Sequence, residues 1–132
     1  MPNTIAEYYI DELLEWNKTI NFYNGEVEEF TQKLGDIIRR NSIPGIAARV
    51  EAHQTLLNRL SEKFYKLQML MKEQEAVLKT DSTLIDDTLI NTETEKRQNE
   101  LRRKMQAAEK EYIDVKFDCY NFLSETLKKR KE

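Results

Sequence analysis

The sequence is poor in the residues that mark β-hairpins, disulfide-bonded folds and membrane spans. Of 132 residues, 3 are glycine and 2 are proline, so turns are scarce and long uninterrupted segments remain. Cys119 is the only cysteine, which excludes an intramolecular disulfide. No run approaches the roughly 20 apolar residues of a membrane-spanning helix, and the N-terminus lacks the pattern of a secretory signal. These features predict a soluble, cytoplasmic protein without membrane insertion.

Neither positive nor negative charge is in large excess. The chain has 21 Lys and Arg against 24 Asp and Glu, a formal charge of −3, so nothing draws it generally to nucleic acid or anionic membranes. Charged residues make up 34% and hydrophobic residues 39%, and the two kinds are interleaved. This composition predicts one helical domain over residues 1–132 with a large hydrated surface.

Apolar residues instead recur at alternating spacings of three and four along three segments. The seam positions are Tyr9, Leu13, Trp16, Ile20, Tyr23, Val27, Phe30, Leu34 and Ile37; then Val50, His53, Leu57, Leu60, Phe64, Leu67, Met71, Gln74 and Leu78; then Gln98, Leu101, Met105, Ala108, Tyr112, Val115, Cys119 and Phe122. A mean spacing of about 3.5 residues places each set along one helix face and favours coiled-coil packing. We therefore predict an all-α, antiparallel up-down-up three-helix bundle with coiled-coil-like heptad packing.

The local signals divide the chain into helices over about 4–40, 44–80 and 92–128, with a connection over 81–91. Thr4 with Glu7, and Thr92 with Glu95, have capping-box spacing at two helix starts. Pairs of an acid followed four residues later by a base support the helices. Two such pairs are Glu62/Lys66 and Glu100/Lys104.

The connection 81–91 carries Leu84, Ile85, Leu89 and Ile90. The third helix is short of apolar residues where it begins, so we expect this connection to be ordered and to fold over that end of the bundle, with room for a helical turn. Asn24-Gly25 is a strong turn dipeptide in other settings, yet the apolar pattern passes through it unbroken. The pattern leaves open whether the first helix bends or breaks there.

Few residues suggest chemistry. His53 lies on a seam among Val50, Leu57 and Leu60, which offer no metal ligand or acid partner, so a partly buried, hydrogen-bonded histidine is favoured. Cys119, also on a seam, is expected to be a small core residue. No phosphate-binding loop, nucleophile motif or metal-spaced cysteine pair is found. We predict no catalytic residue, metal, cofactor or small-molecule substrate.

Two polar seam residues, Gln74 and Gln98, are placed by the topology toward the same end of the bundle. Such residues often fix the register of packed helices at some cost in stability. A mutual hydrogen bond and simple hydration are both compatible with the sequence.

A second apolar stripe runs along the third helix, offset from its seam. It comprises Ile113, Phe117, Tyr120 and Leu127, interrupted by Ser124. Each helix of a three-helix bundle touches two neighbours, so this stripe is either a broad core face or an interface. The same helix carries two basic clusters, 102–104 and 128–131. They suit a solvated face, or contact with phosphate.

The run 16–26, WNKTINFYNGE, continuing to Phe30 and Leu34, resembles a pattern in small uncharacterised bacterial helical proteins. This resemblance covers mainly the first helix and implies no activity. The layout of three heptad helices with Trp16 in the first also resembles spectrin-type repeats, although the helices here are somewhat longer. No residue roles follow from either resemblance.

These observations predict a non-enzymatic intracellular interaction or scaffold module that binds a protein partner, or itself as a homodimer, through apolar helix faces. The alternative is a regulatory binder of nucleic acid or anionic lipid that uses the basic C-terminal helix. Salt separates the two, because phosphate binding weakens steeply with added salt.

Overall fold

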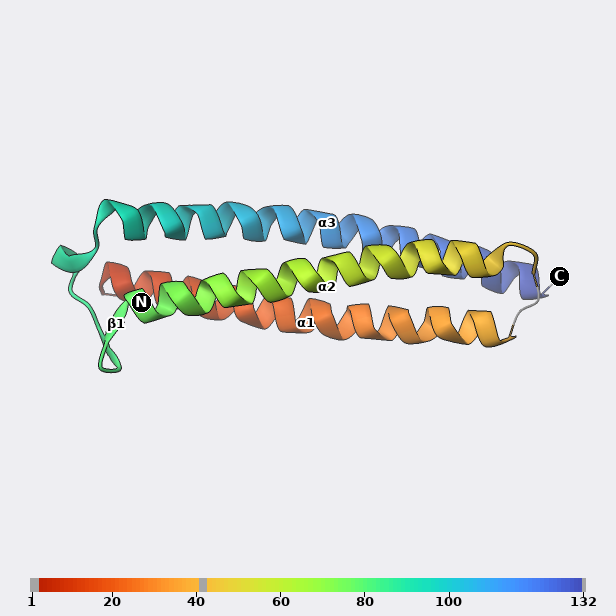
Figure 1. Ribbon diagram of the computed structural model, residues 1–132, viewed down its shortest axis with the longest axis horizontal. Helices are drawn as coiled ribbons and strands as arrows, with labels where there is room; N and C mark the ends of the chain where they lie inside the picture. Colours follow the sequence, from red (N-terminus) through yellow and green to blue (C-terminus); the bar gives the residue numbers. More distant parts are fainter. Residues whose placement is uncertain (1–2, 41–42, 132) are drawn as a thin grey trace.

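The computed structural model describes residues 3–40 and 43–131, with side chains as far as Thr126. Three helices form the molecule: α1 (Ile5–Arg40), α2 (Ile46–Val77) and α3 (Thr92–Lys131). They lie side by side in an up-down-up arrangement, and α1 and α3 begin at the same end (Figure 1). The all-α three-helix prediction is confirmed. No helix in the described ranges is both long and apolar enough to cross a membrane.

The three predicted seams form the core. All their members are buried except Trp16, Tyr23 and His53, which are partly buried. Ala6 and Ile46 extend the core toward the starts of α1 and α2. Burial of apolar surface on three facing stripes is therefore the main force that holds the helices together.

Side chains that accept backbone N–H groups fix two helix starts. Thr4 Oγ1 accepts the Glu7 N–H at 3.1 Å, and Glu7 Oε2 accepts the Asn3 N–H at 2.9 Å. At α3 the cap is Asn91, whose Oδ1 accepts the Thr94 N–H at 2.8 Å. The expected cap at Thr92 is wrong by one residue, because asparagine is a stronger N-cap than threonine and precedes it.

The connection between α2 and α3 is ordered. Strands β1 (Lys79–Thr80) and β2 (Thr83–Leu84) form a short antiparallel hairpin, followed by the 3₁₀ helix η1 (Asp87–Leu89). Asp81 and Ser82 turn the hairpin with φ of 48° and 68°, the positive pair of a tight two-residue turn. The second helix thus ends at Val77 rather than at about residue 80, since residues 79–80 pair with the returning strand.

The connection covers the end of the bundle. Leu84, Ile85 and Ile90 pack against the core, whereas Leu89 is exposed. Asp87 Oδ1 accepts the Ile5 N–H at 2.8 Å, which ties the connection to the first turn of α1. Helix α1 is continuous from Ile5 to Arg40, so residues 24–25 do not break it.

Glycine substitutions provide a test of this backbone. A Cβ at Gly25, Gly35 or Gly45 would meet no atom within 4 Å, so steric clashes do not enter. Gly25→Ala and Gly35→Ala are each expected to raise the free energy of unfolding by roughly 1 kcal/mol, because glycine is a poor residue inside a helix. Gly45 has φ of 78°, and Gly45→Ala is expected to lower that free energy by about 1 kcal/mol.

Urea denaturation of the three variants would measure these changes. A destabilised Gly25→Ala variant would show that α1 is not a regular helix at that position.

Candidate functional site

The only histidine lies beside the core near the start of α2. Its ring stacks on Phe122 of α3, with ring centres 4.7 Å apart, and its buried Nδ1 has no hydrogen-bond partner. Burial lowers the pKa of His53, nearby Arg49 acts in the same direction, and Asp118 opposes both. The predicted partial burial is confirmed, but the ring nitrogen Nδ1 lacks the expected hydrogen bond.

Cys119 is fully buried in the core, and no described cluster of histidine, cysteine, aspartate and glutamate could hold a metal ion. Burial raises the pKa of the Cys119 thiol to about 11, with Asp118 adding to the effect. The thiolate is the nucleophilic form of cysteine. A neutral, enclosed thiol therefore acts here as a core side chain.

A buried polar layer crosses the bundle near the 81–91 connection. Gln74 Nε2 donates to Gln98 Oε1 at 3.1 Å and to the Thr94 carbonyl oxygen at 3.0 Å. Gln98 Nε2 in turn donates to the Tyr9 carbonyl oxygen at 3.2 Å and to Glu12 Oε1 at 3.1 Å. The hydrogen bond between the two seam glutamines, one of two options that the sequence allowed, is present.

An ion pair extends this layer toward the surface between α1 and α3. Arg102 Nε donates to Glu12 Oε2 at 2.9 Å, and its Nη2 donates to Oε1 of the same carboxylate. The hydrogen bond to Glu12 is the main factor that raises the pKa of Arg102. Two parallel hydrogen bonds of this kind hold the guanidinium plane in one orientation. Arg102 is therefore part of an ion pair between α1 and α3, and it is not a free cation of the basic cluster 102–104.

Arg102→Met is expected to lower the free energy of unfolding by about 1–2 kcal/mol, since it leaves the partly buried Glu12 carboxylate without its partner. Arg103→Met, at the exposed neighbouring position, is expected to change it by less than about 0.5 kcal/mol. Urea denaturation of both variants measures the difference. Equal losses would mean that the ion pair does not stabilise the fold.

His53 predicts a pH dependence of stability. The pKa of His53 in the folded state lies below its ordinary value of 6.5. As the pH falls through 6.5, the histidine therefore takes up a proton more readily in the unfolded chain than in the folded chain. The histidine therefore destabilises the fold below about pH 6.5. In His53→Gln the loss of unfolding free energy between about pH 7.5 and about pH 5 should be smaller than in the natural chain. If both proteins lose the same unfolding free energy between these pH values, titratable groups other than His53 cause the pH dependence.

The second stripe of α3 is not part of the core. Exposed fractions are 56% for Ile113, 64% for Phe117 and 52% for Tyr120. The Leu127 side chain lies outside the described residues. Of the two options for this stripe, a core face is excluded for the three described members.

The stripe borders the seam where α1 and α3 meet. Here Tyr23 stacks on Tyr112 with ring centres 3.9 Å apart, and Phe30 meets Tyr120 edge-on at 5.2 Å. Burial, together with a hydrogen bond to Glu109, raises the pKa of Tyr23 to about 12. Aromatic side chains therefore close this contact between α1 and α3: Phe30 and Tyr112 are buried, Tyr23 is partly buried and Tyr120 is about half exposed.

The charged group at the centre of this seam is Glu26 of α1. It accepts hydrogen bonds from Tyr112 and from Lys116 Nζ, the latter at 3.0 Å to Oε1. Lys116 also lies over the Tyr120 ring at 5.9 Å. These contacts place Lys116 between Glu26 and the Tyr120 ring, beside the stripe.

A cavity of about 400 Å³ opens next to Tyr120, between α1 and α3. Ile37, Leu123 and Tyr120 supply its apolar wall, and Lys33 and Arg40 stand at its edge. Phe22 of α1, which is 62% exposed, immediately precedes Tyr23 in the sequence and is a further open aromatic ring. The apolar spacing did not identify Phe22, because Phe22 is not one of the positions that repeat every three or four residues. The sequence marked it only as an aromatic residue on an otherwise polar helix face.

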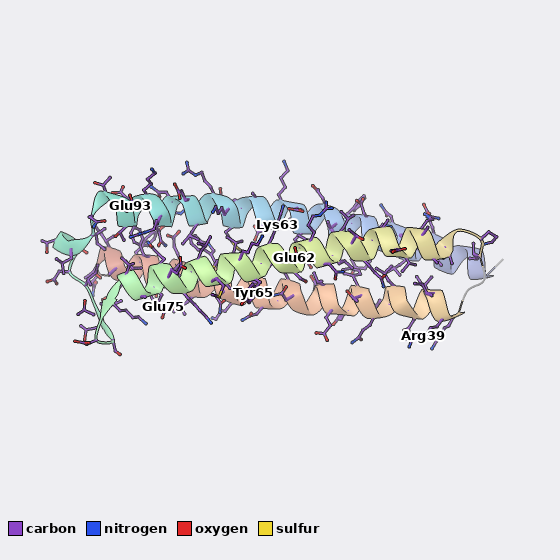
Figure 2. The ribbon with its side chains drawn as sticks, viewed as in Figure 1. Arg39, Glu62, Lys63, Tyr65, Glu75 and Glu93 are labelled. Carbon is purple, nitrogen blue, oxygen red and sulfur yellow. The ribbon has the colours of Figure 1, made fainter. Side chains whose placement is uncertain are left out.

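Exposed apolar side chains also occur on α2. Tyr65, labelled in Figure 2, is 64% exposed but has no place in any of the cavities described here. Among the basic residues, Arg103 and Lys104 are exposed, and the side chains of residues 128–131 lie outside the described part of the chain. The α3 stripe has three apolar residues that are each more than half exposed, with a cavity beside Tyr120. Ile5 and Tyr8 of α1, which are 42% and 49% exposed, line another cavity at the opposite end of that helix.

No family model matches the chain, and searches of curated proteins and of solved structures found no match either. The resemblances to bacterial helical proteins and to spectrin-type repeats stay predictions.

Proposed function

We propose that the protein is a non-enzymatic interaction module that binds another protein through the outer face of α3. The observation that carries the proposal is the stripe Ile113, Phe117 and Tyr120, three large apolar side chains in two helical turns, each more than half exposed. Contiguous exposed apolar surface usually marks a binding site. Aromatic residues in particular supply much of the binding energy at protein interfaces.

The surroundings of the stripe support this use. Tyr120 is oriented by its edge-on contact with Phe30, and Lys116 is held by Glu26, so the binding surface is preorganised. The cavity between α1 and α3 offers a place for an apolar side chain of the partner. The buried, neutral thiol of Cys119 favours binding over catalysis.

The alternative, binding of nucleic acid or anionic lipid by the basic end of α3, has less support. Arg102, one of three cations in its central cluster, is engaged by Glu12. A phosphate-binding surface needs several free cations in one place. Binding of nucleic acid or lipid is therefore one outcome that the experiment below distinguishes.

The test compares Ile113→Glu/Phe117→Glu with the natural chain. Tyr120 is left unchanged because it contacts Phe30. The double variant should lose at least tenfold in affinity for a captured partner, or for itself, because two carboxylates replace apolar contacts. Capture from native cell extract, together with light scattering of the purified chain, measures both forms of binding.

Tyr65→Glu is the matched control, since it places the same charge at an equally exposed position on α2. It should bind as the natural chain does, and all three proteins should unfold at similar urea concentrations. Binding that survives in the double variant contradicts the proposal. Recovery of nucleic acid or lipid that is lost with added salt favours the alternative.

A further inference from the structure

The pair Asn24-Gly25 lies inside α1, between two residues that contact α3. Among the asparagines of the sequence, only Asn24 is followed by glycine. Asn24 is partly buried and Gly25 is exposed, so water reaches the pair. A Cβ at Gly25 would meet no packed neighbour within 4 Å. The pair is therefore open to a reaction with solvent whenever its own conformation allows one.

Asparagine followed by glycine is the dipeptide most prone to spontaneous deamidation, because glycine has no side chain to hinder the approach of its backbone nitrogen. That nitrogen loses its proton and attacks the side-chain Cγ of asparagine. The bond between Cγ and the amide nitrogen breaks, ammonia leaves and a succinimide ring remains. Water then adds to one of the two ring carbonyls and opens the ring, which gives aspartate or isoaspartate. No group is oxidised or reduced, and water is the only co-reactant.

The helical conformation of α1 blocks this attack. Each N–H inside a helix donates to the carbonyl oxygen four residues earlier, so the Gly25 nitrogen is not free to lose its proton. The helical ψ angle of Asn24 also holds that nitrogen out of reach of the Asn24 Cγ. Deamidation of the folded chain therefore requires that α1 opens locally around this pair.

Contacts with α3 on both sides of the pair oppose such an opening. The Tyr23 hydroxyl donates to Glu109 Oε2 at 2.9 Å, and the Tyr23 ring stacks on Tyr112. Glu26 accepts hydrogen bonds from the Tyr112 hydroxyl and from Lys116 Nζ. Glycine is itself a poor residue inside a helix. These contacts, rather than the local sequence, therefore keep this segment of α1 helical.

We propose that Asn24 is a site of spontaneous deamidation, and that the contacts of Tyr23 and Glu26 with α3 set its rate by controlling the local opening of α1. The reaction uses only water and groups of the chain itself. It modifies one segment of one helix, and it does not depend on the binding function proposed for the outer stripe of α3.

The isoaspartate product cannot restore the original contacts. Isoaspartate at position 24 places one additional carbon atom in the main chain, and a carboxylate replaces the neutral amide. The additional atom changes the helical register between Tyr23 and Glu26, so both side chains cannot reach their partners on α3 at once. A brief opening of α1 is thus converted into a permanent weakening of the contact between α1 and α3.

The test follows deamidation of the purified full chain in mildly alkaline buffer, where the attacking nitrogen loses its proton more readily. Mass spectrometry of proteolytic peptides measures the mass gained when OH replaces NH₂, and chromatography separates the isoaspartate and aspartate products. The same measurement in concentrated urea gives the rate of the unfolded chain. At Asn24 the folded natural chain should react at least roughly tenfold more slowly than the unfolded chain, because the helix must open first.

Tyr23→Phe/Tyr112→Phe removes both hydroxyl hydrogen bonds and keeps both rings. Its rate in the folded state should rise by roughly tenfold, because two hydrogen bonds to carboxylates are lost, and its rate in urea should be unchanged. Gly45→Ala is the matched control, since its strained backbone lies outside α1 and the variant is expected to lose overall stability. The folded Gly45→Ala chain should react at the rate of the natural chain. Gly25→Ala should suppress the reaction in both states.

A rate in Gly45→Ala that rises in proportion to its loss of unfolding free energy overturns the proposal, because the reaction would then require global unfolding. An unchanged rate in Tyr23→Phe/Tyr112→Phe overturns the role of the contacts with α3. Equal rates in the folded and unfolded natural chain would show that α1 gives no protection, and would likewise overturn it. If urea denaturation shows that the double variant does not fold, Lys116→Met replaces it, with an expected increase of about threefold from loss of the ion pair with Glu26.

Discussion

The hydrogen bond between Gln74 and Gln98 sets the alignment on which the remaining contacts depend. Apolar seams with a repeat of three and four residues can pack in more than one register, since a shift by one heptad again places apolar residues face to face. A buried amide pair allows one register only, because any shift leaves donors and acceptors without partners. This alignment also places Glu12 beside Arg102 and Tyr23 on Tyr112.

Two of the contacts between helices, α1–α3 and α2–α3, are closed in different ways. The α1–α3 contact is bridged by the stacked rings of Tyr23 and Tyr112 and by Glu26, and the Tyr120 ring is about half exposed at its outer edge. The α2–α3 seam has the polar layer at one end and Arg49 with Glu125 at the other, with alanines between them. A fold of one simple type thus carries two surfaces of different chemistry.

Much of the fold follows from the sequence because each seam is an almost unbroken series of apolar positions. The spacing alone identified the core and the two seam glutamines, but it left open whether the first helix continues through Gly25. It did not identify the hairpin at 79–84, since Asp81-Ser82 is not among the strong turn dipeptides and the strands are two residues long. Nor did it give the cap at Asn91, because a cap depends on which of several polar residues meets the first free N–H groups.

The exposed apolar surface was only partly predictable from the sequence. The stripe on α3 stood out as surplus apolar residues, but its exposure depends on how far α1 turns around α3. The depressions between α2 and α3 depend on how closely the two helices pack beside Leu70, Ala107 and Ala108, which the spacing of apolar residues does not specify. Lys63 pairs across the seam with Glu111, and Lys66 and Lys104 are left free, a choice that local spacing does not specify.

The link between Ile5 and Asp87 has a consequence for how the chain assembles during synthesis. The first turn of α1 is completed by a residue 82 positions later, and Gln98 and Arg102 then add contacts to Tyr9 and Glu12 of the same helix. When α2 has left the ribosome, α1 can already pair with it, but the N-terminal end of α1 still lacks these partners. The N-terminal end of α1 is therefore translated before α2 and α3 but is among the last parts of the bundle to reach its final environment.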